Sequence, residues 1–403
     1  MIGVSKLYCG TVEPSDVLRY DRKSTRLPSR LLQFSADKTP VVVWNVTRVC
    51  NLACRHCYAE ATPDPAPNEL TLREGFYLID HLAEYGVPVI LFSGGEPLLH
   101  PHIFELIARA VKNGLRAVLS TNGLLIDREK AVRLAGLGLS YVGVSLDGLA
   151  TTHDQLRHRP GAFNLTMRAL SAAREAGLKI GLRFTMHRQN IHELPGIFNL
   201  LANEDIPRVC FYHLVTYGRG RNFDDMTLGP AETRQALDLI VDQAVKFQIS
   251  GHPREVLTVD NHADGPYLYL KMKQTGNQRR AATILELLRL NGGNSSGRGI
   301  GAISWNGDIH PDQFWRSITL GSVRDRDFAE IWHDPNPSLL NALKNKKDYV
   351  TGRCRHCVFL DVCGGNLRAR AEAATGNIWG EDPACYLTDE EISTDLINLN
   401  GVA

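Results

Sequence analysis

The sequence predicts an α/β protein: a partial (β/α)6 TIM-like barrel followed by a cysteine-rich C-terminal extension. One observation is a rhythm of short apolar runs and helix signals that begins at residue 41. Such runs, bounded by turn residues, are typical of buried parallel strands joined by helices. The other is that seven of the nine cysteines fall in two groups, one behind the first run and one in the last hundred residues.

The bulk properties bound the class of protein. At 403 residues and 43% hydrophobic content, the chain is long enough for two or three domains with a sizeable core. Its formal net charge of +1 gives no electrostatic reason to expect nucleic acid or an anionic membrane as a partner. The start lacks a signal-peptide pattern, and no apolar run reaches membrane-spanning length. We therefore expect a cytoplasmic protein whose cysteines serve metal or redox chemistry.

The chain divides into four expected segments. An N-terminal arm covers residues 1–40, the barrel 41–260, a bridge 261–300 and the cysteine-rich domain 301–403. A closed (β/α)8 barrel would need two more units than the six that the sequence offers. The strands are expected near residues 41–47, 87–93, 115–120, 141–146, 179–186 and 208–214.

Helix signals lie between the expected strands. Thr71 and Glu74 have the spacing of a capping box, and Gly114 and Gly177 lie where helices should end. A further amphipathic helix is expected from Gly229 to about residue 247.

Three cysteines follow the first expected strand within eight residues, at Cys50, Cys54 and Cys57. Three thiolates this close can hold an iron–sulfur cluster by three of its four irons. The fourth iron is then open to a ligand that the protein does not supply. The alternative is a zinc or disulfide site, but zinc sites usually arrive as two Cys-x2-Cys or Cys/His pairs.

Glycines and small polar residues follow the next three strands where each ends, and a basic residue lies within the fifth. The carboxyl ends of barrel strands carry the chemistry, so these positions should face one site. For each loop the alternative is a plain turn, because Asn-Gly and Asp-Gly form turns on their own. The residues are Gly94, Gly95 and Glu96, then Ser120 and Asn122, then Ser145 and Asp147, and lastly Arg183.

The second cysteine group comprises Cys354, Cys357, Cys363 and Cys385. Four thiolates are enough to saturate a [4Fe–4S] cluster, and zinc is again the alternative. The stretch around Trp305 to Asp312 holds no cysteine, so we expect one auxiliary cluster rather than two. The remaining cysteines, Cys9 and Cys210, are expected to be buried or incidental thiols.

The Cys-x3-Cys-x2-Cys spacing followed by an aromatic residue resembles the radical S-adenosylmethionine (SAM) superfamily. The second cysteine group, with Gly364-Gly365-Asn366, resembles the SPASM/twitch extension that carries auxiliary clusters. The resemblance implies two [4Fe–4S] clusters and SAM as cofactors, and a one-electron donor such as flavodoxin or ferredoxin as a partner. By the same resemblance the Gly-Gly-Glu loop binds the SAM amino group, and Arg183 pairs with the SAM carboxylate. The implied SAM contacts are His56, Tyr58, Gly94, Gly95, Glu96, Ser120, Asn122, Ser145, Asp147 and Arg183.

The opening residues 2–16 and the approach Val43-Trp44-Asn45 to the triad resemble the tetrapyrrole-modifying branch of these enzymes. The likeness is greatest to the didecarboxysiroheme deacetylases of the alternative haem pathway. It implies removal of two acetate side chains from 12,18-didecarboxysiroheme, giving Fe-coproporphyrin III through a 5′-deoxyadenosyl radical. The alternatives are a haem synthase that decarboxylates Fe-coproporphyrin III propionates, a d-type haem synthesis enzyme, a radical SAM peptide maturase, and an iron–sulfur electron carrier without catalysis.

Arginines can pair with the carboxylates of an iron tetrapyrrole, and a histidine can ligate its iron. Arginines in loops past the fourth and sixth strands, and His310, are therefore candidate substrate contacts, although charged loops are often only solvated. We leave open which of five histidines ligates the substrate iron: His153, His158, His187, His213 or His310. The candidate substrate arginines are Arg157, Arg159, Arg219 and Arg221.

Overall fold

The computed structural model describes residues 1–13, 39–335 and 338–393. One eleven-stranded sheet runs through it in the order β1-β8-β7-β6-β5-β4-β3-β2-β9-β10-β11. Seven neighbouring strands of this sheet, β2 to β8, pair in parallel and form the barrel wall. Their bounds are β2 (Val41–Thr47), β3 (Val89–Gly94), β4 (Arg116–Thr121), β5 (Tyr141–Ser145), β6 (Ile180–Met186), β7 (Arg208–His213) and β8 (Glu255–Val259).

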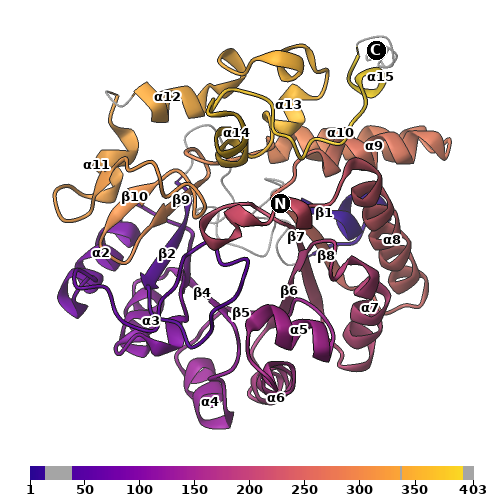
Figure 1. Ribbon diagram of the computed structural model, residues 1–403. Helices are drawn as coiled ribbons and strands as arrows, with labels where there is room; N and C mark the ends of the chain where they lie inside the picture. The colour runs from indigo at the N-terminus through magenta and orange to yellow at the C-terminus, as the bar shows by residue number, and fades with distance from the viewer. Residues whose placement is uncertain (14–38, 336–337, 394–403) are drawn as a thin grey trace.

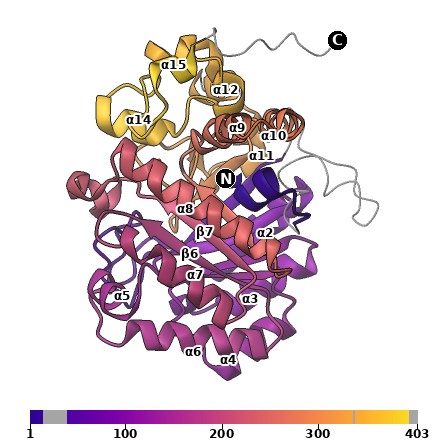
Figure 2. The same cartoon turned by 90° about the vertical axis from the view of Figure 1, so that its right-hand side faces the viewer.

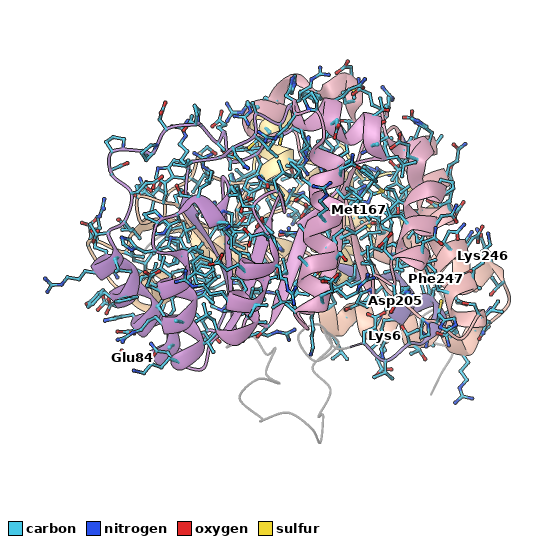
Figure 3. All side chains as sticks on the ribbon, turned by 90° about the horizontal axis from the view of Figure 1, so that it is seen from below. Lys6, Glu84, Met167, Asp205, Lys246 and Phe247 are labelled. Atoms are coloured by element: carbon cyan, nitrogen blue, oxygen red, sulfur yellow. The ribbon has the colours of Figure 1, made fainter. Side chains whose placement is uncertain are left out.

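Helices surround the outer face of this wall (Figure 1). Parallel neighbours need a crossover, and each crossover here contains at least one helix that buries an apolar side against the strands. The helices are α2 (Leu72–Glu84), α3 (Ile103–Lys112), α4 (Arg128–Gly136), α5 (Ala150–Arg157), α6 (Ala162–Glu175), α7 (Leu194–Asn203) and α8 (Pro230–Ile249). The barrel is open, and the ends of α2 and α8, marked by Glu84 and Lys246, lie on opposite sides of the molecule (Figure 3).

The predicted helix signals are confirmed. The Thr71 hydroxyl accepts from the Glu74 backbone N–H, and the Glu74 carboxylate accepts from the Thr71 N–H over 2.8 Å, so α2 begins with a complete capping box. Gly114 and Gly177 follow α3 and α6 with positive φ angles of 82° and 78°. The helix expected from Gly229 is α8.

All six predicted strands are present, but the count of six was too low. A seventh parallel strand, β8, pairs with β7 at the end of the segment assigned to the barrel. Its sequence Glu-Val-Leu-Thr-Val follows a polar stretch and offers only five residues, which makes a weak pattern.

The first residues do not form a separate arm. Strand β1 (Ile2–Gly3) pairs with β8, and the following turn, Ser5–Cys9, packs against α8, with Leu7 fully buried. The rest of the predicted arm, residues 14–38, lies outside the described residues. The short opening segment therefore closes the free edge of β8.

The C-terminal part extends the other edge of the same sheet. Strand β9 (Ile300–Ile303) pairs in parallel with β2, and β10 (Asp308–His310) and β11 (Gly321–Ser322) follow antiparallel. Two helices, α9 (Asp264–Gln274) and α10 (Gln278–Asn291), pack on each other before it. The remaining helices, drawn in orange and yellow, lie together on one side of the barrel (Figure 2): α11 (Phe328–His333), α12 (Ser338–Lys344), α13 (Leu360–Cys363), α14 (Arg368–Thr375) and α15 (Asp389–Ile392).

No helix among the described residues has both the length and the apolar character that crossing a bilayer requires.

Candidate active site

A cavity of about 180 Å³ lies at the carboxyl ends of the parallel strands. Strands β3 to β7 each contribute at least one residue from their last two positions, so the sheet brings together segments far apart in the chain. Most of the sequence-predicted site residues line it: Cys50, Cys54, His56, Cys57, Tyr58, Gly94, Gly95, Ser120, Asn122, Ser145, Arg157, Arg183 and Arg219.

The cysteine triad lies on the loop that follows β2. Its backbone is fixed at both ends, because Cys50 N–H donates to the Thr62 carbonyl over 2.8 Å and Cys57 N–H donates to the Cys54 carbonyl over 3.4 Å. All three thiols are free and line the same cavity. Burial raises the pKa of Cys50 to about 12, so binding of a metal cluster must displace its proton.

This donor set fits an iron–sulfur cluster with an open iron. Among the described residues, no three His, Cys, Asp or Glu side chains converge on a single ion position. A four-iron cluster does not need such convergence, because each thiolate binds a different iron. Cys50, Cys54 and Cys57 are the residues that would hold it.

A buried chain of charged groups supports Cys54. The Arg157 guanidinium donates from Nη1 to Cys54 Sγ over 3.3 Å, and its Nη2 is bound to the Asp147 carboxylate. His56 Nε2 lies 3.2 Å from the same carboxylate. Burial alone would raise the pKa of Asp147, but Arg157 and His56 outweigh it and hold the pKa below its ordinary value. Asp147 is therefore an anion that orients Arg157 and His56, and it does not line the cavity.

Gly94 and Gly95 are required by the triad loop. Gly94 has a φ of +127°, and a Cβ atom there would lie 2.4 Å from the Thr47 carbonyl oxygen. A Cβ atom on Gly95 would lie 2.2 Å from the Val49 carbonyl oxygen. The N–H of Gly95 donates to Thr47 over 2.9 Å. On the side of the triad loop, both glycines therefore pack against backbone. Both also line the cavity.

Glu96 does not line the cavity. It is fully buried, and its carboxylate accepts from the Leu98 N–H, from the Thr121 hydroxyl over 2.8 Å and from the Asn122 N–H over 2.9 Å. Burial raises its pKa to about 7 in spite of these three donors. Glu96 therefore joins the loop after β3 to the loop after β4, and positions Asn122, which does line the cavity.

Arg183 and Tyr212 separate this cavity from a second one of about 480 Å³, and both residues line both cavities. Arg183 Nη2 donates to the Tyr212 hydroxyl over 2.7 Å, and its Nη1 is bound to the Ser120 hydroxyl. The second cavity is lined by residues from the amino ends of the strands, such as Val41 and Val89. The predicted pairing of Arg183 with a SAM carboxylate stays a proposal.

Two of the substrate contacts expected from the sequence, Arg157 and Arg219, line the cavity. Arg219 donates to the carbonyls of Cys54 and Ala61, over 3.0 and 2.6 Å, so it ties down the triad loop. The structure does not bring Arg159, Arg221 or His310 to the cavity. The ring of His310 is buried and bonded at both nitrogens, to Ser304 and the Ile318 carbonyl.

The four C-terminal cysteines are also brought together. Burial is the main cause that raises the pKa of Cys363 well above its ordinary value, and the neighbouring Cys385, Cys354 and Cys357 raise it further. All four thiols are free. Four neighbouring thiols are enough to ligate every iron of an auxiliary [4Fe–4S] cluster.

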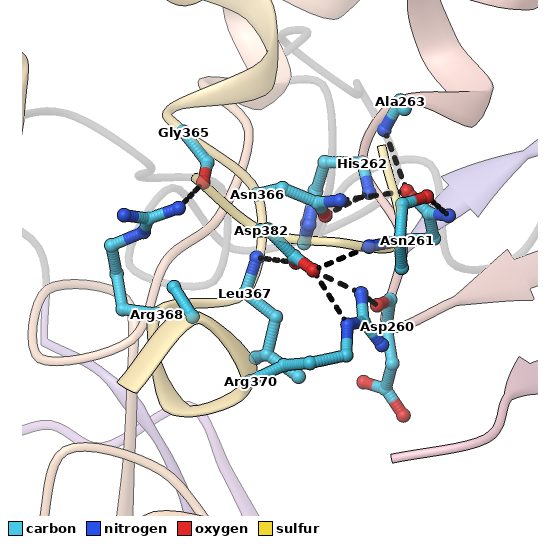
Figure 4. A network of polar contacts seen from close by, with 12 residues as sticks. Asp260, Asn261, His262, Ala263, Gly365, Asn366, Leu367, Arg368, Arg370 and Asp382 are labelled. Atoms are coloured by element: carbon cyan, nitrogen blue, oxygen red, sulfur yellow. Dashed lines mark hydrogen bonds and ion pairs between the residues drawn. The ribbon is translucent and has the colours of Figure 1, made fainter. Parts of the chain in front are cut away.

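A polar network fixes this cysteine-rich part to the end of β8 (Figure 4). Arg370 pairs with Asp382 over 2.7 Å and donates to the Asp260 carbonyl over 2.8 Å. Asn366 accepts from the His262 N–H over 2.7 Å. The Asp260 carboxylate points away from this network and lines the cavity. Burial raises its pKa to about 6, and its Oδ2 has no hydrogen-bond partner among the described residues.

Of the five histidines left open as iron ligands, His213 lines the cavity, at the end of β7. Other cavity residues were missed by sequence reasoning. Tyr212 precedes His213, and its position near a strand end was the available signal. Asp260 follows β8, which was not predicted, and Gln313 and Phe314 come from the C-terminal part. Nothing in the sequence marks those three for this cavity.

Comparison with known proteins agrees with this arrangement. Residues 44–201 match the Radical SAM superfamily, and residues 296–358 match SPASM, an iron–sulfur cluster-binding domain. The chain also has the fold of native anSMEcpe with bound AdoMet and Cp18Cys peptide, with a TM-score of 0.66 and 17% identity over 86% of this chain and 94% of that one.

Three curated relatives are similar over most of their length. The Fe-coproporphyrin III synthase of Methanosarcina barkeri is 57% identical, covering 97% of this chain and 99% of that one. The pre-heme d1 synthase of Dinoroseobacter shibae is 39% identical over 88% of each chain. The AdoMet-dependent heme synthase of Nitratidesulfovibrio vulgaris is 32% identical over 88% of this chain and 94% of that one.

The Radical SAM match covers the triad, and the SPASM match covers Cys354 and Cys357 of the second group. The cofactors are [4Fe–4S] clusters and SAM. The chain therefore belongs to the radical SAM enzymes with a SPASM extension, in the tetrapyrrole-modifying branch that serves haem biosynthesis.

Proposed function

We propose that this enzyme forms Fe-coproporphyrin III by removing the two acetate side chains of 12,18-didecarboxysiroheme. The observation that carries the proposal is the 57% identity, over nearly the whole of both chains, to a relative named for synthesis of that product. When bound at the triad, the cluster and SAM supply a 5′-deoxyadenosyl radical able to take hydrogen from an unactivated C–H bond.

The residues of this chain position the cysteine ligands and exclude water from the cavity. Arg157 and Arg219 fix Cys54 through its sulfur and its carbonyl, and Glu96 holds the loop that carries Asn122. Apolar side chains of Leu214, Val215 and Phe314 line the cavity beside these polar groups. Such a wall suits the apolar face of a macrocycle and excludes water from a reactive intermediate.

A second candidate is a haem synthase that acts on Fe-coproporphyrin III rather than forming it. The similarity to an AdoMet-dependent heme synthase over 94% of its length favours this candidate. The two reactions share the radical step and differ in which pigment enters and which side chains change. Offering each pigment separately therefore separates them.

The experiment is an anaerobic incubation of the holoprotein with reductant, SAM and one pigment at a time, followed by mass spectrometry. The proposal expects didecarboxysiroheme to lose two acetate groups while 5′-deoxyadenosine accumulates. The variant Cys54→Ala should make neither product, and Cys9→Ser, a cysteine outside the cavity, should behave as wild type. Decarboxylation of Fe-coproporphyrin III with didecarboxysiroheme untouched would favour the haem synthase.

A further inference from the structure

His213 is the last residue of β7 and lines the cavity with only 8% of its surface exposed. Its Nε2 lies 2.9 Å from the Asp264 carboxylate. Its Nδ1 makes no hydrogen bond among the described residues and is the ring nitrogen left for a ligand. The position matches the strand ends where barrel enzymes place their functional groups.

Asp264 is held so that it can orient this ring. It is fully buried at the start of α9, and its second oxygen accepts from the Tyr386 hydroxyl over 2.8 Å. A carboxylate next to Nε2 favours the tautomer with the proton on Nε2, which leaves a lone pair on Nδ1. Histidines that bind metals almost always donate their other N–H in this way.

We propose that Nδ1 of His213 is an axial ligand of the iron in the tetrapyrrole substrate, an assignment that rests on the function proposed above. The macrocycle supplies four nitrogens to its iron, so the protein needs to add only one. A single histidine is therefore sufficient, and no cluster of protein ligands is required.

The other histidines are placed less well. His153, His158, His187 and His310, which the sequence left as equal candidates, do not line the cavity. His153 and His187 each accept a backbone N–H at Nδ1, over 3.1 and 3.2 Å. His56 does line the cavity, but it lies within the cysteine triad, next to Cys57. It is therefore the histidine against which His213 has to be tested.

The His213–Asp264 pair is also bonded to the segment that carries the auxiliary cysteines. Tyr386, which donates to Asp264, is the chain neighbour of Cys385. The ring orientation of His213 is thus tied to the cysteine-rich part as well as to the barrel.

The test uses spectroscopy of bound pigment, without turnover. Holoprotein is mixed anaerobically with ferric Fe-coproporphyrin III or didecarboxysiroheme, without SAM, and examined by absorption, EPR and resonance Raman with ¹⁵N-histidine labelling. Wild type should show a nitrogen-ligated iron whose vibration shifts with the label. His213→Ala should bind the pigment about 10-fold more weakly and lose the label shift, and added imidazole should restore the ligated spectrum.

Two further variants sharpen the result. Asp264→Asn should keep the ligation but raise the midpoint potential of the bound iron, because His213 becomes a weaker donor. His56→Ala should keep the label shift. Cluster absorbance equal to wild type in each variant shows that the protein is folded.

The outcomes separate the inference from the proposed function. If wild type binds neither pigment, the proposed function fails and the ligand assignment fails with it. If wild type binds pigment and folded His213→Ala gives the same labelled vibration, only the assignment is overturned. Loss of the vibration in His56→Ala alone would also overturn it.

Discussion

Arg157 donates a hydrogen bond to the sulfur of Cys54 over 3.3 Å, and Asp147 binds the other end of the same guanidinium. Arg157 on α5 and Cys54 on the triad loop are 103 positions apart in the chain. A donor aimed at a thiolate stabilises the reduced form of an iron–sulfur cluster, because reduction adds negative charge to its sulfurs. We therefore expect Arg157 to influence the midpoint potential of a cluster held at the triad.

Arg157→Lys should lower the midpoint potential of the SAM-binding cluster, because lysine keeps the charge but cannot reach both partners as a fork. Potentiometric EPR of the reduced cluster measures this. Arg159→Lys, an exposed neighbour outside the cavity, is the matched control and should leave the potential unchanged. Equal potentials in all three proteins would show that the Arg157–Cys54 contact has no electronic role.

Arg157→Met should also destabilise the fold, since it leaves the Asp147 carboxylate buried without its main partner. Breaking a buried pair in this way costs about 3 kcal/mol. The double variant Arg157→Met/Asp147→Asn should recover part of that loss. Differential scanning of the holoproteins gives the comparison, and a double variant no more stable than the single one would contradict it.

Gly95→Ala should lose the cluster site. The added Cβ would lie 2.2 Å from the Val49 carbonyl oxygen, which is backbone and cannot swing away. The triad loop must then shift, and a displacement of about 1 Å at a reacting centre can cost about 100-fold in rate. Gly136→Ala is the control, because it meets nothing within 4 Å and lies in helix α4. Iron content and a rate of SAM cleavage equal to those of wild type in Gly95→Ala would refute the packing argument.

Glu96 should make stability depend on pH. Its pKa is raised from 4.5 to about 7, so the folded protein holds a proton that the unfolded chain releases between those values. This stabilisation is present at low pH and is lost as the pH rises toward 7, by about 3 kcal/mol in total. From pH 5.5 to 7, wild type should lose thermal stability relative to Glu96→Gln, and the two curves should run parallel above pH 7.5. Parallel curves throughout would contradict a raised pKa.

Cys357→Ser should leave SAM cleavage measurable while product formation falls. The four C-terminal thiols are enough to ligate every iron, so their cluster suits electron transfer and not SAM binding. Iron content should drop by about four per chain, and Cys9→Ser should keep the wild-type value. Loss of SAM cleavage together with product would mean that the two clusters do not act separately.

Much of the fold follows from local pattern. The capping box at Thr71 and Glu74 and the apolar parallel strands are set by neighbours in sequence, and each lies where it was expected. The cysteine triad and the strand-end residues converge because carboxyl ends of parallel strands meet at one edge. Periodicity and position are sufficient for this level of description.

The remaining features depend on contacts distant in sequence. The five-residue strand β8 exists because β1 and β7 flank it, which no window of sequence contains. Glu96 and Arg219 are typical ligand-binding residue types, yet the Glu96 carboxylate and two of the three Arg219 nitrogens are hydrogen-bonded to the protein itself. Only the three-dimensional packing decides which polar groups remain free for a ligand.

The central claim is that this barrel directs radical chemistry at an iron tetrapyrrole. The most direct measurement is deuterium transfer from didecarboxysiroheme, labelled at its carbon-bound hydrogens, into 5′-deoxyadenosine during anaerobic turnover with SAM. The account predicts deuterated 5′-deoxyadenosine together with a pigment that has lost two acetate groups. Unlabelled 5′-deoxyadenosine with an unchanged pigment would contradict it.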